Sequence, residues 1–198
     1  LRNKNDNIDI NLFGQELNPQ TYSVCKSDFL ITDEEPENIK LGSTLSKDKF
    51  PGNRKFDFII SNPPYGVNWG PESKFVINES NEINGRFSFG LPSKSDGQLL
   101  FLQHMISKME PSGSKIGVVH NGSPLFSGKS GSGESEIRRK ILNNDLLECV
   151  IRLPDGMFFN TSQTTYILIL NNKKENKRKN KIQLIDGKMF FSRMRKNL

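Results

Sequence analysis

One stretch of the chain, FDFIISNPPYGVNW at residues 56–69, limits most strongly what the chain can fold into. It opens with an apolar, β-branched run that predicts a strand buried on both faces. The two prolines that follow lack an N–H group and have a fixed φ, so the chain must turn as it leaves the sheet. Asn62 and Tyr65 are therefore predicted at the carboxyl end of a strand, where open α/β sheets bind their ligands.

The groups in this turn suit a planar amine. The Asn62 side chain and the backbone carbonyls of Ser61 and Pro63 are hydrogen-bond acceptors. Acceptors on both hydrogens of a conjugated NH2 group return electron density to its nitrogen, which can then attack an electrophilic methyl group. Tyr65 offers an aromatic face on which a flat ring can stack, worth roughly 1–3 kcal/mol per base in single-strand binders. The alternative is that the prolines only shape a rigid turn.

An acidic residue near the start of the chain is a second candidate. Residues 8–12 (IDINL) predict a strand, and Asn18 with Pro19 predicts a helix start just after Glu16. In dinucleotide-type folds, an acidic residue at the end of the second strand holds a ribose through its hydroxyls. Glu16 is therefore a candidate ribose ligand, although a surface carboxylate near a helix start is also favoured by the helix dipole.

The position of Glu16 has a consequence for domain organisation. In such folds the glycine-rich cofactor loop lies roughly 20 residues before the acidic residue. Only 15 residues precede Glu16, and the first glycine is Gly14. We therefore expect the loop and the strand before it to lie upstream of Leu1, so that residues 1–198 form a partial catalytic domain that is inactive by itself.

Strand-like and helix-like patterns alternate along the rest of the chain. A polar, glycine- and asparagine-rich segment at 71–95 is too long for an ordinary connection and predicts a loop that covers the substrate or a surface insertion. Strands are predicted at 38–44, 115–120, 146–153, 164–170 and 182–185, and helices at 96–109 and 134–142.

Two other segments carry possible phosphate contacts. Residues 121–133 (NGSPLFSGKSGSG) look like a phosphate loop, but five residues rather than four separate Gly122 from Gly128, so we predict no nucleoside-triphosphate site. Residues 173–181 (KKENKRKNK) hold six basic residues and one Glu, and thus most of the net charge of +6. This run is either a solvated loop or a contact for nucleic-acid phosphates.

Several classes of protein are excluded. No apolar run approaches the length of about 18 residues that a membrane helix needs, and no signal pattern is visible, so we expect a soluble, cytoplasmic chain. Cys25 and Cys149 lack CxxC spacing and are predicted to be buried free thiols. Two scattered histidines, His104 and His120, do not make a metal site.

The NPPY turn resembles the motif of amino-group methyltransferases that use S-adenosylmethionine. Longer stretches narrow the resemblance to the modification (M) subunit of type I restriction-modification systems, an N6-adenine DNA methyltransferase. These stretches cover most of residues 13–198 and follow the order of that family: GQELNPQTYSVCKSD, FDFIISNPPYGVNW, NGRFSFGLPSKSDGQLLFLQHMISKM, HNGSPLFSGKSGSGESEIRR, LPDGMFFNTSQTTYILIL and IQLIDGKMFFSRMRK.

The resemblance implies an α/β, Rossmann-like methyltransferase fold, with a mostly parallel sheet, helices on both faces and no first strand. It assigns Glu16 to the cofactor ribose. Relatives carry an acidic or amide residue for the cofactor's adenine where this chain has Ser43 and Thr44, of which Ser43 can offer only a hydroxyl. Asn62, Pro63 and Tyr65 are assigned to a flipped-out adenine, Asn62 is also assigned to the cofactor, and Pro64 shapes the turn.

The resemblance also implies partners. These are double-stranded DNA, a second M subunit, a specificity subunit that reads the DNA sequence and a restriction subunit. Two alternatives stay open at this point. One is a protein-glutamine or ribosomal RNA amino-group methyltransferase, which would share the turn. The other is a non-catalytic remnant that acts in assembly or DNA binding.

Overall fold

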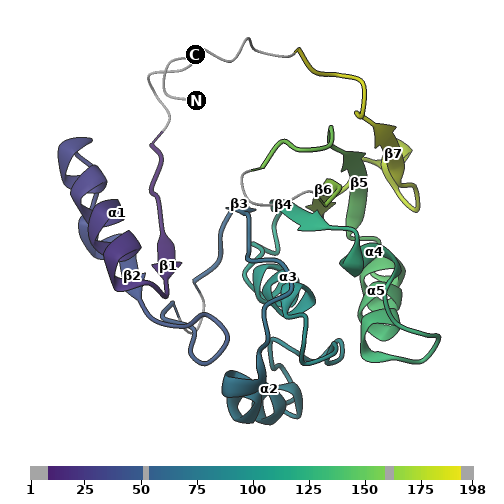
Figure 1. Ribbon diagram of the computed structural model, residues 1–198, viewed down its shortest axis with the longest axis horizontal. Helices are drawn as coiled ribbons and strands as arrows, with labels where there is room; N and C mark the ends of the chain where they lie inside the picture. Colours follow the sequence, from purple (N-terminus) through teal and green to yellow (C-terminus); the bar gives the residue numbers. More distant parts are fainter. Residues whose placement is uncertain (1–8, 51–53, 159–162, 193–198) are drawn as a thin grey trace. The chain divides into compact units, whose positions relative to one another are not determined.

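The computed structural model describes residues 9–50, 54–158 and 163–192 (Figure 1). The chain divides into two compact units, Leu1–Gly52 and Asn53–Leu198. Each unit has its own sheet, and the two are described one at a time below. The expectation that a further strand and a glycine-rich loop precede Leu1 stays a prediction.

The first unit pairs two short parallel strands, β1 (Gly14–Glu16) and β2 (Ile39–Leu41). Between them lie α1 (Pro19–Ile31) and the 3-10 turn η2 (Pro36–Asn38). The predicted helix start is confirmed: the Asn18 side chain accepts hydrogen bonds from the backbone N–H groups of the first turn, and proline occupies the first helical position.

The first predicted strand is misplaced. Residues 9–12 are not a strand, and pairing begins only at Gly14. The partner strand β2 is three residues long, and its register aligns Gly14 with Ile39 and Glu16 with Leu41. The apolar pattern at 8–12 could not reveal this, because the strand's position is set by its partner. Glu16 is thus the last residue of the strand.

The second unit is built on a five-stranded sheet with the order β3–β4–β6–β5–β7. β4 runs parallel to β3 and β7 runs parallel to β5, while β6 is antiparallel to both of its neighbours. Four strands therefore end at one edge of the sheet, called the carboxyl edge below; the opposite edge is the amino edge. The strands are β3 (Phe58–Ser61), β4 (Lys115–Asn121), β5 (Leu147–Arg152), β6 (Thr165–Asn171) and β7 (Gln183–Asp186).

Four helices accompany this sheet: α2 (Ser73–Ser80), α3 (Gln98–Ser107), α4 (Ser123–Phe126) and α5 (Gly133–Asn143). Two 3-10 turns, η3 (Gly70–Glu72) and η4 (Asn176–Arg178), complete the described elements. The loop predicted at 71–95 is thus helical in its first part, where Val76 of α2 is fully buried. Its three apolar residues, Phe75, Val76 and Ile77, are consecutive and show no helical period, so the pattern did not predict the helix.

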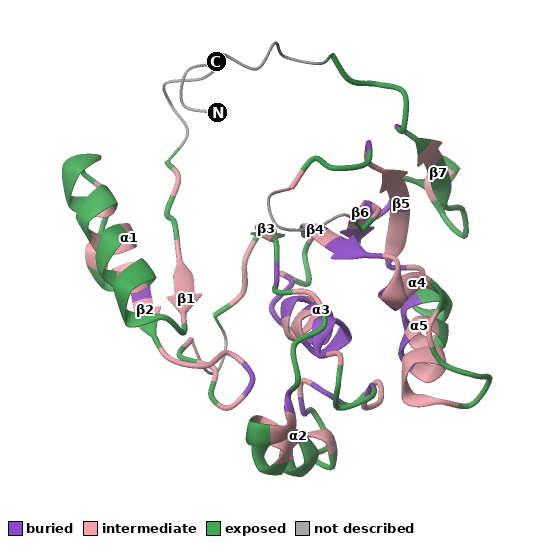
Figure 2. Cartoon of the chain, in the orientation of Figure 1, coloured by how far each residue is buried: buried purple, intermediate pink, exposed green. Residues whose placement is uncertain are grey.

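The core of the second unit lies between the sheet and helices α3 and α5 (Figures 1 and 2). Apolar side chains of both helices pack against alternate residues of β4 and β6, which face the same side of the sheet. Full burial of each Leu or Ile stabilises the fold by roughly 1.5–3 kcal/mol. The buried members are Leu99, Leu102, Met105, Met109, Ile116, Val118, Ile137, Ile141, Leu146, Leu168 and Leu170.

The strand before the NPPY turn is buried on one face and not on both. Ile59 packs against the core, whereas Phe58 and Ile60 are 71% and 89% exposed. Successive side chains of a strand point to opposite faces, so these two lie on the face away from α3. The prediction of burial on both faces is therefore wrong for the described residues, because an apolar run does not say which of its faces a helix will cover.

Candidate active site

The turn after β3 brings Asn62 and Tyr65 into direct contact. The Tyr65 hydroxyl donates a hydrogen bond of 2.7 Å to the Asn62 side-chain oxygen Oδ1. A carbonyl oxygen has two lone pairs, so Oδ1 keeps the capacity to accept from a second donor. Pro63 is buried, while Asn62 and Pro64 are exposed. The turn therefore presents an oriented acceptor at the carboxyl edge of the sheet.

Tyr65 is suited to hold that acceptor. Partial burial raises the pKa of its phenol above the ordinary value, so the hydroxyl stays protonated and remains a donor at neutral pH. The next residue, Gly66, has a φ of 63°, in the left-handed region that favours glycine. The sequence interpretation gave Tyr65 only a stacking face; the hydrogen bond to Asn62 is an addition from the structure.

The chain leaving the turn is fastened to the segment before α3. The Gly97 N–H donates to the Val67 carbonyl over 2.9 Å. Trp69 donates twice, from its backbone N–H to the Lys94 carbonyl over 3.0 Å and from its indole Nε1 to the Ser93 carbonyl over 2.9 Å. Trp69 is 2% exposed. These residues fix the exit of the turn, and sequence reasoning missed them; a large aromatic residue in a polar stretch was the available signal.

The loop after β4 begins at the same edge as the NPPY turn. β3 and β4 are parallel neighbours with Ser61 beside Val118, so Asn121 and Gly122 follow at the carboxyl edge. The segment then forms the short helix α4, and Lys129 precedes the capping residue Ser132 of α5. A phosphate loop would instead lead straight from its lysine into the helix. The prediction that this loop is not a triphosphate site agrees with its path.

The other candidate residues lie in the first unit. Glu16 ends β1, and the Gly42 N–H donates to its backbone carbonyl over 2.9 Å. The Glu16 carboxylate accepts from the Asn18 N–H over 2.7 Å through Oε1. Ser43 and Thr44 follow β2, the parallel neighbour of β1, and are half-buried. Glu16 therefore meets the Gly42–Thr44 segment at one end of the two-stranded sheet.

A glutamine that the sequence interpretation did not consider shapes this end of the first unit. The Gln15 side chain donates to the carbonyls of Gly42 and Lys47 over 3.1 and 2.9 Å and accepts from the Lys49 N–H over 3.0 Å. It thus holds the loop that carries Ser43 and Thr44. The structure brings together Asn62 to Tyr65 in one unit, and Glu16 with Ser43 and Thr44 in the other.

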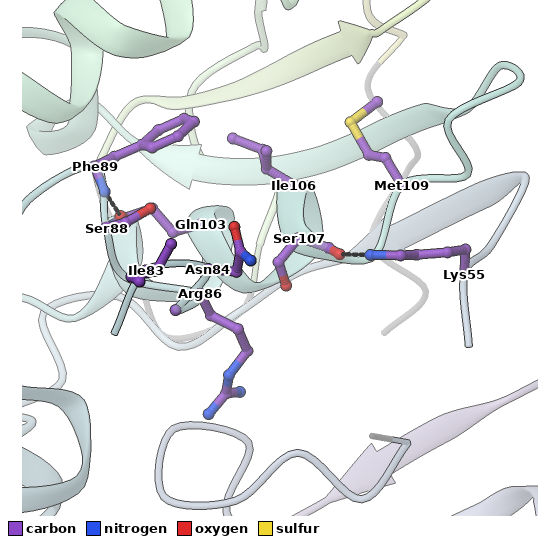
Figure 3. A pocket seen from close by; sticks show the side chains of 11 residues that line it. Lys55, Ile83, Asn84, Arg86, Ser88, Phe89, Gln103, Ile106, Ser107 and Met109 are labelled. Atoms are coloured by element: carbon purple, nitrogen blue, oxygen red, sulfur yellow. Dashed lines mark hydrogen bonds between the residues drawn. The ribbon is translucent and has the colours of Figure 1, made fainter. Parts of the chain in front are cut away.

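A pocket of about 360 Å³ in the second unit lies away from the turn (Figure 3). Its wall includes Lys55, which precedes β3, and Ser107, which ends α3, so it opens toward the amino end of β3. The Lys55 ammonium donates to the Ser107 carbonyl over 2.6 Å, and Arg86 is paired with Glu79. The cations of this wall have partners within the chain, and none of the predicted site residues lines it.

The described part of the chain holds no group of three or more His, Cys, Asp or Glu side chains that could bind a metal ion. Within the same residues, no helix has the length and apolar character to cross a membrane. Cys25 and Cys149 are free thiols as predicted; Cys149 is buried and Cys25 is only half-buried, on the partly exposed helix α1. His120 lies on β4 and His104 on α3.

The basic run is largely engaged within the chain. The Lys174 ammonium, whose side chain is 2% exposed, binds Asp145 over 2.6 Å. Arg178 pairs with Glu148 over 3.2 Å, and Lys177 pairs with Glu175 over 2.8 Å. The run joins the end of β6 to the start of β7, so it lies at the amino edge, opposite the NPPY turn.

The fold and the turn define a class of protein. A mostly parallel α/β sheet with Asn-Pro-Pro-Tyr at a strand's carboxyl end is the arrangement of Rossmann-like, S-adenosylmethionine-dependent methyltransferases. The methyltransferase subunit of a type I restriction-modification system from Streptococcus thermophilus has the same fold, with a TM-score of 0.78 and 28% identity over 92% of this chain and 37% of that one. The EcoKI M protein of Escherichia coli has a TM-score of 0.67 and 26% identity over 93% of this chain and 39% of that one.

The family model for N-6 DNA Methylase matches residues 1–198, and the chain belongs to this family. A curated relative, the type I restriction enzyme HindI methylase subunit of Haemophilus influenzae, is 32% identical over 181 residues, which are 91% of this chain and 38% of that protein. The chain thus spans little more than a third of the length of that relative. The predicted family and fold class are confirmed.

Proposed function

We propose that this chain is part of the catalytic domain of a type I restriction-modification methylase subunit, and that the intact subunit transfers a methyl group to adenine N6 in DNA. The observation that carries the proposal is the Asn62 carbonyl oxygen, held by Tyr65 at the carboxyl edge of the sheet. The turn by itself would suit any planar amine. Membership of the N-6 DNA methylase family favours adenine in DNA over a protein glutamine or a ribosomal RNA base.

The proposed chemistry rests on acceptors. An adenine amine is a poor nucleophile because its lone pair is delocalised into the ring. Hydrogen bonds from both amine hydrogens, to Asn62 Oδ1 and to the Pro63 backbone carbonyl, localise that lone pair on nitrogen. S-adenosylmethionine, when bound, would supply the methyl group: a carbon–nitrogen bond would form as the carbon–sulfur bond breaks, and the methylated amine would release one proton to solvent. Preorganised dipoles of this kind stabilise the positive charge that develops on the amine in the transition state.

Tyr65 acts in two ways in this proposal. Its hydroxyl orients Asn62, and its ring offers a face to the target base. The base must leave the duplex to reach the turn, which costs a few kcal/mol of unstacking and unpairing. Stacking on an aromatic ring returns roughly 1–3 kcal/mol of that cost. Pro63 and Pro64 keep the turn rigid, so the acceptors need no rearrangement when the base arrives.

S-adenosylmethionine is the proposed cofactor and supplies the electrophilic methyl group when bound. The donor set in the first unit fits its ribose. Glu16 is a half-buried carboxylate of which one oxygen accepts from the Asn18 N–H, so the other can accept from ribose hydroxyls. Ser43 and Thr44 lie on the adjacent segment and offer hydroxyls for the adenine end.

The relatives named above are subunits, and we extend the proposal to assembly. The partners are double-stranded DNA, a second methylase subunit, a specificity subunit that reads the sequence and a restriction subunit. A cytoplasmic location follows from that substrate. In this arrangement sequence specificity belongs to another polypeptide.

The test of the proposed function is the identity of the product. The intact protein, with its companion subunits, is incubated with duplex DNA and S-adenosylmethionine labelled in the methyl group. The proposal expects the label in N6-methyladenine. Label on glutamine, on RNA or on cytosine would contradict it. Cofactor and DNA binding with no transfer at all would favour the alternative of a non-catalytic assembly protein.

A further inference from the structure

A closed ring of polar side chains lies at the carboxyl end of β4. One of its members is Gln98, the first residue of α3, which is 0% exposed. Its side-chain Nε2 donates to both carboxylate oxygens of Asp96, over 3.0 and 3.1 Å, and to Asn121 Oδ1 over 2.9 Å. Ser123 closes the ring, because its hydroxyl donates to Asp96 over 2.6 Å and its N–H donates to Asn121 Oδ1 over 2.9 Å.

The orientation of the Gln98 amide follows from its neighbours. The Asp96 carboxylate and Asn121 Oδ1 only accept, so the nitrogen of the amide must face them. The oxygen Oε1 then accepts from the Asn121 backbone N–H and from His120 Nδ1, each over 3.2 Å. His120 is accordingly protonated on Nδ1. The Gln98 amide therefore has one arrangement that satisfies its partners, and this makes the ring rigid.

The ring is continuous with the exit of the NPPY turn. Gly97 lies between the two ring members Asp96 and Gln98 in sequence, and its N–H is the donor to the Val67 carbonyl. The carbonyls of Ser93 and Lys94, a few residues earlier, are the acceptors for Trp69. The segment 93–98 thus touches the loop after β4 through the side chains of Asp96 and Gln98, and the exit of the turn through its backbone.

We propose that Gln98 is a positioning residue for the Asn62–Tyr65 turn. It acts by locking segment 93–98 to β4, and this segment in turn fixes Val67 and Trp69. A buried polar ring in which the members hydrogen-bond one another makes its surroundings rigid and favours one geometry. The role of the turn as the reacting site rests on the proposed function; the mechanical link does not.

The chain offers both a probe and a matched control. Trp69 is the single tryptophan of the sequence, so tryptophan fluorescence reports on the exit of the turn alone. Gln103 lies on the same helix and is 1% exposed. Its side chain binds the Phe89 N–H and the Gly90 carbonyl, over 3.0 and 2.9 Å, and is not a member of the ring. Gln98→Leu and Gln103→Leu thus remove equally buried glutamines from one helix.

The experiment compares these two variants in the full chain. Gln98→Leu should shift the Trp69 emission to the red, increase its quenching by acrylamide and speed hydrogen exchange of the Trp69 and Gly97 amides. Gln103→Leu should leave all of these readouts near their wild-type values, with both variants folded by circular dichroism. If Gln98→Leu folds and Trp69 behaves as in the wild type, or if Gln103→Leu changes Trp69 equally, the positioning role is wrong.

Ser123→Ala is a milder second variant that removes one edge of the ring. If Gln98→Leu does not fold, Ser123→Ala should still shift the Trp69 emission to the red and increase its quenching relative to the wild type; an unchanged Trp69 overturns the proposal. In the complete enzyme, Gln98→Leu should lower kcat by about 10²-fold with little change in KM, the size expected for a misplaced reacting group. If the wild-type enzyme transferred no methyl group while Gln98→Leu still changed the Trp69 readouts, the proposed function would be refuted and the mechanical link would stand.

Discussion

Tyr65 has two proposed roles, since its hydroxyl orients Asn62 and its ring stacks on the target base. Tyr65→Phe keeps the ring and removes the hydroxyl, so the Asn62 carbonyl loses its orienting donor. A neutral hydrogen bond contributes about 0.5–1.5 kcal/mol. Under the proposed function we therefore expect a roughly two- to tenfold lower single-turnover methylation rate. Tyr65→Ala should lose more, because stacking disappears as well. A Tyr65→Phe rate equal to that of the wild type would leave only the stacking role.

His120 predicts a pH dependence of stability. Burial lowers the pKa of its side chain from 6.5 to about 4, although the nearby Asp96 carboxylate opposes the shift. Between these two pH values the unfolded chain binds a proton that the folded chain does not. The free energy of unfolding should therefore fall as the pH drops from about 6.5 to about 4, by about 3 kcal/mol from this group.

His120→Asn is the variant that isolates this contribution, since asparagine can place a donor near Gln98 Oε1 without titrating. Denaturant unfolding at several pH values should give a shallower slope for the variant than for the wild type across that window. Other groups with lowered pKa values, such as the Asp145 carboxyl beside Lys174, contribute equally to both proteins. Identical slopes for the two proteins would contradict the assignment.

At the scale of elements, local signals predicted starts and ends well. Asn18 with Pro19 marked the start of α1, and the apolar period of residues 96–109 marked α3, which the structure gives as Gln98–Ser107. What the sequence could not show was decided by partners. The pairing with β2 set where β1 begins. The helices α3 and α5 pack on one face of the sheet, and Phe58 and Ile60, which point to the other face, stay exposed.

The candidate site was predictable to a similar extent. The apolar, β-branched run and the two prolines placed Asn62 and Tyr65 at the end of a strand, because these constraints are local. The fastening of Trp69 and the ring around Gln98 join residues far apart in the chain, such as Gln98 and Asn121, and depend on which hydrogen bonds form in the folded state. A single sequence contains no signal for such pairs.

The connection between β6 and β7 depends on one buried cation. The Lys174 ammonium donates to Asp145, to the Leu147 carbonyl over 2.7 Å and to the Lys181 carbonyl over 3.2 Å. Lys174→Met keeps the length of the side chain and leaves these acceptors without their donor. We expect a loss of about 2 kcal/mol in the free energy of unfolding, measured with urea.

Lys177→Met is the matched control in the same run. The Lys177 side chain is 78% exposed and its partner Glu175 is 71% exposed, so this ion pair should contribute little. Equal stability losses in the two lysine variants would contradict the prediction that the buried lysine contributes more to stability than the exposed one. A wild-type stability for Lys174→Met would show that water replaces the buried ammonium without cost.

At the scale of the second unit, the two edges of the sheet carry different loops. Lys129 is exposed and lies between α4 and the start of α5, after the strand end that neighbours the NPPY turn, whereas Lys177 lies in the run at the amino edge. If DNA binds at the carboxyl edge, Lys129→Ala should flatten the salt dependence of DNA affinity by about 0.9 in log–log slope, the value for one lost phosphate contact. Lys177→Ala should leave the slope unchanged. A flatter slope for Lys177→Ala and an unchanged slope for Lys129→Ala would indicate that DNA binds at the amino edge.

In the proposed function, the Asn62 carbonyl accepts a hydrogen bond from the amine that is methylated. The most direct test is single-turnover methylation of duplex DNA by the complete subunit assembly with Asn62→Ala, alongside Asn84→Ala, an exposed asparagine in the wall of the separate pocket. Removing a preorganised polar group of this kind costs about 10²–10³ in rate. We predict that loss for Asn62→Ala with DNA affinity retained, and wild-type transfer for Asn84→Ala. An Asn62→Ala enzyme that methylates at the wild-type rate would contradict this role of Asn62.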